Sequence, residues 1–400
     1  MNDLRNKILV GDNRTTLKDV PSGSVHCCVT SPPFWGLRDY GYDGQIGLEP
    51  TPLEYVAEMV KVFREIHRVL RDDGVCWVEI GDSYAGSCGA QSREILGVKP
   101  KDMVGIPWMV AFALRDELGF WLRDDVIWNR PNPMPSSVTD RCTKSHSYVF
   151  MFTKSARYFF DQEAIKEKSV SAGETRGGGK KASSLNGQYA HRADTQRLDQ
   201  FGETSATRNK RSGWEIDDPY ALHQWLAEKN PELLNEFFDT GKSSFWNIST
   251  SGFKGAHFAV FPPKLIEPMI LAGSPEKCCS KCGAPYLRQV EKVRVPTRPG
   301  TNSKVNRASQ HDESSYNSHG GSVVGNRDPQ RHCTTTKTVG FEPSCDCQAG
   351  EQRAIVIDPF GGSGTTAQVA QETGRDWIMC EGNEDYVGMI EKRTEQGVMF

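Results

Sequence analysis

The residues best suited to grip a reactive group are 31–35, which read SPPFW and follow the apolar run 25–30. Proline fixes its own φ angle and restricts the residue before it, so two successive prolines predict a stiff, extended turn at the end of a strand. A hydroxyl, a carbonyl without an internal donor and an aromatic ring held together there could grip a planar ring bearing an NH2 group. The alternative is an ordinary proline-rich strand exit with aromatic packing.

A second segment, DPFGGSGTT at residues 358–366, predicts a turn between a strand and a helix that approaches a ligand closely. Glu381 ends the next apolar run about 20 residues beyond this turn, the offset at which a carboxylate can bond ribose hydroxyls. NAD and S-adenosylmethionine both carry an adenosine. The turn departs from G-x-G-x-x-G, however, and is poorly built for the pyrophosphate that only NAD contains. The alternative is a tight strand-to-helix connection without a ligand.

The last third of the chain contains two short arms with metal-ligand spacing, C-x-x-C-G at residues 279–283 and C-x-C at residues 345–347. Paired cysteines before a glycine form a knuckle that can direct two thiolates at one tetrahedral ion. We therefore expect a structural zinc bound by Cys279, Cys282, Cys345 and Cys347. Free reduced cysteines in a loop are the alternative, and the competing ligands are Cys278, His332 and Cys333.

Residues 1–160 alternate strand-like and helix-like patterns, which predicts an α/β domain with a parallel sheet that positions these segments. Apolar residues recur at helical spacing in 53–70 and 106–118, and apolar runs predict strands at 8–10, 25–30, 75–80, 121–128 and 147–152. Helical material returns at 220–238, apolar and aromatic residues return at 245–271, and 354–393 reads strand, glycine turn, helix, strand, helix. Both chemical segments thus follow predicted strands.

The polar stretches 166–211 and 288–337 interrupt this pattern and are rich in Lys and Arg. Either could follow a phosphate backbone or could be a solvated insertion. The expected organisation is a catalytic part at 1–160, a target-recognition region at 161–244, a return to the catalytic core at 245–277, a cysteine-bearing insertion at 278–350 and a cofactor-binding part at 351–400.

Composition narrows the class of protein. The chain has 400 residues, 37% hydrophobic and 25% charged, and a net charge of −3, so the whole molecule is not strongly basic. No apolar run reaches the roughly 20 residues that span a bilayer, and the start lacks the build of a secretion signal. We expect a soluble, cytoplasmic protein whose thiols stay reduced. Thiols inside apolar runs are read as core residues: Cys27, Cys28, Cys76 and Cys380.

Taken together, the motifs resemble those of the beta group of DNA amino-methyltransferases. TSPPFWG is similar to their catalytic motif and DPFGGSGTT to their S-adenosylmethionine motif, in the order of that group. Further blocks are similar as well: GDNRTTL, KPKDMVGIPWMVAFAL, WLRDDVIWNRPNPMPSS, DRCTKSHSYVFMFTKS and FWNISTSGFKGAHFAVFPPKL. The resemblance implies a Rossmann-like α/β methyltransferase fold with circularly permuted motif order, carrying target-recognition and zinc-knuckle-like insertions. The chain departs from the pattern at Ser147, where the family commonly has Glu, and at Phe34, where Tyr is frequent.

The resemblance also implies roles for individual residues. The Ser31 hydroxyl and the Pro32 carbonyl would accept the two amine hydrogens, and Phe34 would stack on a base rotated out of the duplex; Trp35 is either a wall of this site or plain core. Asp358 and the turn would hold the methionine portion, and Glu381 the ribose. Asp12 would reach the adenine, or cap a helix. The predicted catalytic residues are Ser31, Pro32, Pro33 and Phe34, and the predicted cofactor residues are Asp12, Asp358, Phe360, Gly361, Gly362, Gly364 and Glu381.

The expected function is therefore site-specific transfer of a methyl group from S-adenosylmethionine to the 4-amino group of cytosine in double-stranded DNA. In the family, Ser at the position of Ser31 goes mainly with cytosine and Asp with the 6-amino group of adenine, so adenine is the alternative. More distant alternatives are a nicotinamide-dependent oxidoreductase and a nonenzymatic zinc-bearing DNA-binding protein. The expected partner is DNA with a flipped target base; a cognate restriction endonuclease and the oligomeric state stay open.

Overall fold

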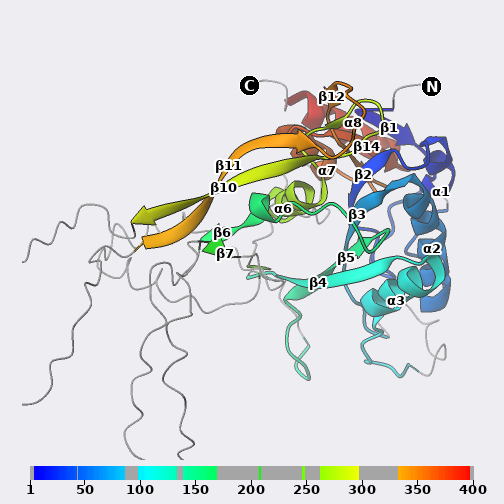
Figure 1. Ribbon diagram of the computed structural model, residues 1–400. Helices are drawn as coiled ribbons and strands as arrows, with labels where there is room; N and C mark the ends of the chain where they lie inside the picture. The colour runs from blue at the N-terminus through cyan, green and yellow to red at the C-terminus, as the bar shows by residue number, and fades with distance from the viewer. Residues whose placement is uncertain are drawn as a thin grey trace, which may run out of the picture. The chain divides into compact units, whose positions relative to one another are not determined.

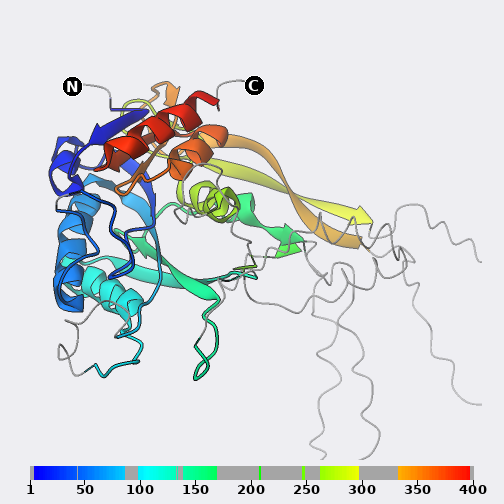
Figure 2. The same ribbon diagram turned by 180° about the vertical axis from the view of Figure 1, so that it is seen from behind.

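The computed structural model shown in Figures 1 and 2 forms two compact units, residues 1–165, 210–288 and 341–400 in the first and residues 166–209 and 289–340 in the second. The residues that it describes are 4–42, 44–85, 98–131, 133, 138–168, 207–208, 246–247, 262–296 and 332–396. The predicted helical segment 220–238 and most of the two basic stretches lie outside these residues.

One eight-stranded sheet organises the first unit, in the order β1-β14-β13-β2-β3-β5-β4-β8. The strands from the two ends of the chain are interleaved in it, because β13 and β14 lie between β1 and β2. Their bounds are β1 Lys7–Val10, β2 Val25–Thr30, β3 Leu70–Ile80, β4 Trp121–Asn129, β5 His146–Thr153, β8 Trp246–Asn247, β13 Ile355–Asp358 and β14 Asp376–Glu381.

The prediction of a parallel sheet is confirmed for part of the sheet and is wrong at one strand. The neighbouring strands from β1 to β3 pair in parallel, but β5 runs antiparallel to both β3 and β4. The physical reason lies in the connections: a helix lies between β3 and β4 in the chain, which permits these two strands to run parallel, whereas no helix is described between β4 and β5. The sheet is therefore mixed, with its parallel part around β13 and β2.

Helices cover both faces of this sheet. On one face α2 (Pro52–Val69) packs with α3 (Ile106–Leu118), and on the other α6 (Pro263–Gly273) packs with α7 (Thr365–Glu372), which in turn contacts α8 (Glu384–Gln396). The shorter helical turns are α1 Asn13–Thr16, η1 Leu17–Asp19 and η3 Gln162–Ile165. Figure 1 shows α2 and α3 together on the side of the sheet away from α6.

Strand residues alternate between the two hydrophobic clusters under these helices. In β2, Cys28 packs with the α2 and α3 cluster, whereas Cys27 and Val29 pack with the α6 and α7 cluster. The sheet is buried on both faces, which explains why its parallel strands read as continuous apolar runs. The four thiols predicted to be core residues are all buried, as expected.

The two long helices begin and end where local chemistry dictates. Thr51 and Glu54 form a reciprocal capping box at the start of α2, with a proline in the first turn. The start of α3 is capped from a distance, because Asp82 Oδ1 accepts the N–H groups of Gly105 and Ile106 at 2.9 and 3.0 Å. The left-handed Gly119 then ends α3.

The remaining strands lie in small sheets. β9 (Cys278–Cys279) pairs with β12 (Glu351–Gln352) in the first unit, and β6 (Glu167–Lys168) pairs with β7 (Thr207–Arg208). β10 and β11 form a two-stranded sheet whose bounds are Tyr286–Pro296 and His332–Pro343. Among the described residues, no helix has the length and apolar character needed to cross a membrane.

Candidate active site

The two segments singled out in the sequence meet at neighbouring strand ends. β13 pairs with β2, and the hydroxyl of Thr30 at the end of β2 donates to Asp358 Oδ1 at the end of β13, over 2.6 Å. From β13 the chain passes through α7 to β14 on one side, and from β2 it passes through α2 to β3 on the other. The strand order thus reverses between β13 and β2, which is where open α/β sheets bind ligands beyond the carboxyl ends of their strands.

Asp358 is buried and holds the two strand ends together. Its Oδ1 accepts from Thr30 and from the N–H of Phe360 (3.0 Å), and its Oδ2 accepts from the hydroxyl of Thr366 (2.7 Å) at the start of α7. Burial raises the pKa of Asp358 to about 7, against the lowering effect of these three hydrogen bonds. The carboxylate therefore positions the turn from inside the protein.

The glycine turn is shaped by close packing against β14 and α8. A side chain at Gly364, whose φ is +81°, would meet Ile390 at 3.0 Å, and one at Gly361 would meet the Cys380 carbonyl at 3.2 Å. Gly362 differs, because among the described residues a Cβ there has no heavy atom nearer than the Phe360 carbonyl at 3.9 Å. Its φ of +50° is nevertheless a conformation that favours glycine. Two of the three glycines serve the fold, and Gly362 borders open space.

Glu381 ends β14 beside this turn. Its carboxylate accepts the N–H of Gly362 at 2.6 Å and that of Asn383 at 2.8 Å, and burial raises its pKa. The ring of Tyr42 lies against the next residue, since a Cβ at Gly382 would be 3.0 Å from it. Burial and the charge of Glu381 raise the pKa of Tyr42 to about 12. A carboxylate and an aromatic ring therefore lie side by side at the end of β14.

Asp12 occupies the position of a helix cap. It precedes α1, and its side chain accepts the backbone N–H of Arg14 at 2.8 Å. It also forms an ion pair with the Arg14 guanidinium at 2.7 Å, and that guanidinium reaches Glu58 at 2.7 Å. The capping alternative raised for Asp12 is thus what the structure shows; a role toward adenine stays a prediction.

Ser31 is bound to a carboxylate that the sequence analysis did not select. The Ser31 hydroxyl donates to Glu79 Oε2 over 2.6 Å. β2 and β3 pair in parallel with Thr30 opposite Val78, which brings the following residues, Ser31 and Glu79, side by side. Since the hydroxyl donates its proton to the carboxylate, the lone pairs of Ser31 Oγ are left to accept a hydrogen bond from another group.

Glu79 lies in a buried polar network. Burial raises its pKa, while the Ser31 hydroxyl, the positive charge of Arg130 and the Ser147 hydroxyl lower it. Arg130 in turn donates to Ser147 Oγ at 2.7 Å. The sequence analysis predicted no role for Ser147, at a position where the DNA amino-methyltransferases commonly have Glu. The structure nevertheless places the Ser147 hydroxyl in this network. A buried carboxylate with a raised pKa next to a serine hydroxyl is typical of functional sites.

The rest of the SPPFW segment is held by packing. The Tyr55 hydroxyl donates to the Pro33 carbonyl at 2.8 Å. This carbonyl therefore already accepts a hydrogen bond; the carbonyl predicted to accept the amine is that of Pro32. The Phe34 ring lies on Gly81, where a Cβ would approach it to 2.6 Å. Trp35 is buried in the core and donates to the Glu49 carbonyl at 2.9 Å. Of the two alternatives for Trp35, the structure supports core.

Sequence reasoning missed Glu79 and Tyr42. One signal could have found Glu79: it is the acid that interrupts the apolar run VCWVEI, and a charge in a buried strand needs a partner. Tyr42 offers no comparable signal, because its position against Gly382 arises from the path of the loop after the SPPFW segment.

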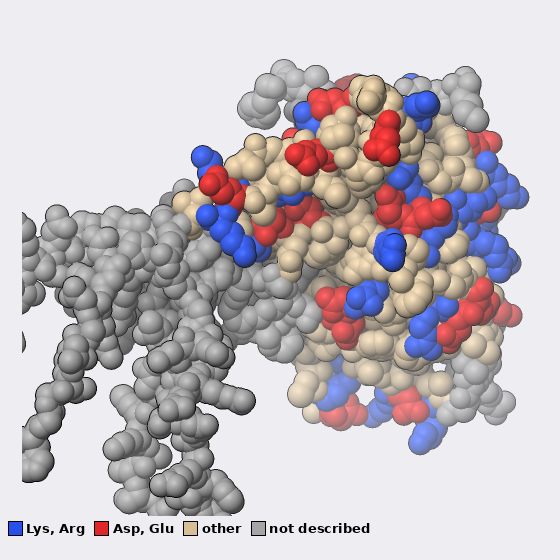
Figure 3. Space-filling view, in the orientation of Figure 1, with Lys and Arg blue, Asp and Glu red and all other residues tan. Residues whose placement is uncertain are grey.

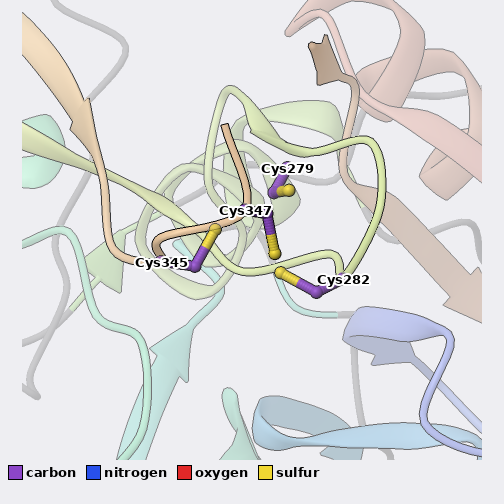
Figure 4. Close-up of side chains that lie close together, drawn as sticks. All are labelled: Cys279, Cys282, Cys345 and Cys347. Atoms are coloured by element: carbon purple, nitrogen blue, oxygen red, sulfur yellow. The ribbon is translucent and has the colours of Figure 1, made fainter. Parts of the chain in front are cut away.

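The predicted metal ligands also converge. The Sγ atoms of Cys279, Cys282, Cys345 and Cys347 all lie within 4.8 Å of one another, and Figure 4 shows the four side chains gathered from two separate loops. Backbone N–H groups of Cys282 and Lys281 lower the pKa of the Cys279 thiol to about 6. Between the adjacent candidates Cys278 and Cys279, the geometry selects Cys279. The structure does not describe the side chains of the competing ligands His332 and Cys333.

Charge on the described surface is mixed. In Figure 3, Lys and Arg side chains are interspersed with Asp and Glu over the described part of the visible face, without one continuous basic area. The basic stretches predicted to follow a phosphate backbone fall largely outside the described residues. Where duplex DNA would bind therefore stays a prediction.

Comparison with known proteins gives a consistent result. A model of the N6_N4_Mtase family, described as DNA methylase, matches residues 25–278 and 348–392. The chain is 39% identical over 279 residues to the Type II methyltransferase M.XycI of Xanthomonas campestris pv. cyanopsidis, covering 66% of this chain and 71% of that protein. It is 30% identical over 403 residues to the Type II methyltransferase M.SmaI of Serratia marcescens, covering 97% and 90%.

Among solved structures, the chain is similar to PvuII DNA methyltransferase (cytosine-N4-specific), with 19% identity, a TM-score of 0.47 and coverage of 97% of this chain and 86% of that one. The two stretches matched by the family model leave out residues 279–347, and all four clustered cysteines lie in that segment.

Proposed function

Because the chain belongs to the N6/N4 family of DNA methylases, we propose that it transfers a methyl group from S-adenosylmethionine to the 4-amino group of cytosine in double-stranded DNA. The observation that carries this proposal is the hydrogen bond between Thr30 and Asp358, because it brings the SPPFW turn and the glycine turn to adjacent strand ends. A base held by the first turn would lie next to a cofactor held by the second. The Type II names of the relatives favour action at a defined recognition sequence.

The residues at the end of β14 fit a nucleoside cofactor without a pyrophosphate. The Glu381 carboxylate keeps acceptor capacity beyond its hydrogen bonds from the backbone N–H groups of Gly362 and Asn383, as binding of ribose hydroxyls requires. A ligand could approach the protein backbone closely at Gly362, where the described residues leave space, and the Tyr42 ring supplies an apolar wall. When bound there, S-adenosylmethionine supplies an electrophilic methyl group on a sulfonium.

The protein's own contribution is to hold and polarise the target amine. An exocyclic amine is a poor nucleophile because its lone pair is delocalised into the ring. Ser31 Oγ, oriented by Glu79, and the Pro32 carbonyl would accept its two N–H groups and localise the lone pair on nitrogen. Such fixed acceptors lower the barrier by positioning and electrostatics. Glu79, with its pKa raised by burial, is suited to take up the excess proton through the Ser31 hydroxyl.

The target amine must leave the duplex to reach this site. Rotating a base out of the stack costs a few kcal/mol. Stacking on an aromatic face returns roughly 1–3 kcal/mol, a comparable amount. Phe34 is the proposed stacking residue. It follows Ser31 by three residues, and its ring packs on Gly81, which comes just after β3.

Cytosine is preferred over adenine because the acceptor at residue 31 is a neutral hydroxyl instead of a carboxylate. The experiment is reaction of the purified protein with unmethylated duplex DNA and S-adenosylmethionine, followed by nucleoside analysis by mass spectrometry. We expect 4-methylcytosine. A product of 6-methyladenine alone would overturn the cytosine assignment but leave the amino-methyltransferase activity standing, and transfer to neither base would overturn both.

A further inference from the structure

The four clustered thiols have the spacing that a single metal ion requires. Zinc bound at about 2.3 Å to four sulfurs in a tetrahedron keeps those sulfurs about 3.8 Å apart. The Sγ atoms of the cluster lie within 4.8 Å of one another, so small side-chain movements would bring all four onto one ion. Cys279 is buried, whereas Cys282 is exposed, which leaves a path for an ion to enter.

Backbone hydrogen bonds form the first arm without any metal. Cys279 donates its N–H to the Ala284 carbonyl and accepts the N–H of Gly283, both at 2.8 Å. Gly283 has a φ of +70°, the left-handed conformation that lets the chain turn back under the two thiols. The adjacent Cys278 is directed elsewhere, since its Sγ donates to the Gln352 carbonyl at 3.4 Å.

The second arm is attached to the first at both of its ends. Before Cys345, Ser344 donates both its N–H and its hydroxyl to the Pro285 carbonyl, at 3.1 and 2.7 Å. After Cys347, the pairing of β12 with β9 puts Glu351 opposite Cys279. The ligands are therefore presented by a framework that is already closed, which reduces the entropy lost when an ion binds.

This framework is fastened to the main sheet by two side chains. The Ile355 N–H on β13 donates to His26 Nδ1 at 3.1 Å, so the other ring nitrogen, Nε2, carries the proton and donates to the Gly283 carbonyl at 3.0 Å. Arg71 donates to the Cys282 carbonyl at 2.7 Å. A Cβ at Gly283 would lie 2.6 Å from the Arg71 guanidinium, so glycine is also needed for this approach.

We propose that Cys279, Cys282, Cys345 and Cys347 bind one zinc ion in a closed, structural tetrathiolate site. The site would cross-link the two chain segments that leave the first unit at Arg288 and re-enter it at Phe341. A cross-link across so long an insertion stabilises the fold by restricting the unfolded chain. Four thiolates leave no open coordination position, so the ion takes no part in chemistry.

The four cysteines lie outside the regions that the family model matches, which stop before Cys279 and resume after Cys347. Soft thiolate ligands in tetrahedral geometry favour zinc over the oxygen-seeking ions Mg²⁺ and Ca²⁺. The four cysteines are free thiols in the structure, as metal binding requires.

The test begins with the 400-residue chain, purified under reducing conditions from a zinc-supplemented culture without chelator. Elemental analysis is expected to give one zinc per chain. Titration with a mercurial thiol reagent should release that zinc as four thiols react. Reconstitution with Co²⁺ alone should give the intense near-ultraviolet charge-transfer and visible bands of a tetrahedral tetrathiolate. No stoichiometric zinc, or a cobalt spectrum of octahedral type, would overturn the proposal without any variant having to fold.

Variants then assign the ligands. Cys282→Ser and Cys347→Ser should each lower the zinc content and unfold at a lower temperature than the wild type. Two matched controls should keep the full zinc content: Cys142→Ser, which removes an exposed thiol, and Cys278→Ser, which removes the thiol next to the site. Loss of zinc from Cys278→Ser with retention in Cys282→Ser would overturn the assigned ligand set. Methyl transfer is not used as a readout, so failure of the functional proposal would leave these results unaffected.

Discussion

The hydroxyl of Ser31 donates to the carboxylate of Glu79 over 2.6 Å, across two parallel strands whose sequence positions are far apart. This contact decides how Ser31 can act. A free serine hydroxyl could donate or accept, but one that gives its proton to a buried carboxylate presents only lone pairs on its outer side. The contact therefore makes Ser31 an acceptor suited to an amine, and it makes Glu79 a positioning residue for the reaction.

Ser31→Ala removes this acceptor. We expect kcat for methyl transfer to fall about 100-fold or more, the usual effect of deleting one fixed hydrogen-bonding group at a reacting centre. The affinity for S-adenosylmethionine, measured by calorimetry, should stay close to that of the wild type. Ser24→Ala is a matched control, because Ser24 is a half-buried serine just before β2 whose hydroxyl donates to the Pro21 carbonyl. Near-normal turnover of Ser31→Ala would contradict the proposed role.

Glu79→Gln keeps an acceptor for the Ser31 hydroxyl but removes the charge. In the wild type, kcat should rise with pH as Glu79 ionises, and the raised pKa of Glu79 should place this rise above the ordinary glutamate range near 4.5. The variant should have a lower kcat and should lack this acidic limb. The pH profile of kcat checks both points, with Glu117→Gln as a control at an exposed position of α3. An identical limb in wild type and Glu79→Gln would rule out Glu79 as its source.

Asp358→Asn tests the carboxylate that joins β2 to β13. The pKa of Asp358 is raised from 3.8 to about 7 in the folded protein, so between these values the folded state holds a proton that the unfolded state has lost. The free energy of unfolding of the wild type should therefore fall as pH rises from about 4 to about 7, by at most about 4 kcal/mol from this group. The Asp358→Asn variant should not lose this free energy of unfolding, because asparagine does not titrate. Urea unfolding at pH 5 and pH 8 should show the variant gaining relative to the wild type at the higher pH; a pH-independent difference would contradict the raised pKa.

The bounds of several strands and helices of the main sheet domain were predictable, because glycine and proline residues mark where these elements begin and end. The sequence predicts the bounds of β2 and α3 as the structure has them: α3 begins after Gly105 and ends before Gly119, and the apolar run of β2 ends at the first proline. The direction of β5 was not predictable, because an apolar run does not encode whether its neighbours are parallel. The partner of Ser31 depended on the register between β2 and β3, which shifts at an irregularity between Val25 and Cys27.

Which of Cys278 and Cys279 joins the thiol cluster also depended on strand pairing, which the sequence does not reveal. Adjacent residues in a strand point to opposite sides, so the pairing of β9 with β12 decides which thiol faces the cluster. Residue types thus indicate which chemistry is available, whereas strand register and pairing select the atoms that meet.

Gly362→Val tests the cofactor side of the site. A Cβ at residue 362 has no heavy atom of the described residues nearer than the Phe360 carbonyl at 3.9 Å, so lost binding would report on the ligand's space instead of a clash of this atom inside the protein. We expect binding of S-adenosylmethionine in calorimetry to fall below detection. Gly23→Val is the matched control: its φ of +65° imposes a similar backbone strain, and a Cβ there meets no atom of the described part of the chain within 4 Å. Unchanged affinity in Gly362→Val, or equal loss in both variants, would contradict the assigned pocket.

The proposed role of Phe34 is to stack on the base that is rotated out of the duplex. Its ring packs on Gly81 beside the Ser31 turn, where a flipped base would need an aromatic face. Phe34→Ala should remove roughly 1–3 kcal/mol of stacking, which lowers kcat/KM for duplex DNA about 5- to 150-fold. Phe34→Tyr, the residue frequent in the resembling family, should keep the stacking and most of the activity. A duplex with a mispaired target base should partly rescue Phe34→Ala, because less energy is needed to flip that base. If the alanine variant is equally impaired on paired and mispaired DNA, Phe34 serves the packing of the turn and not the flipped base.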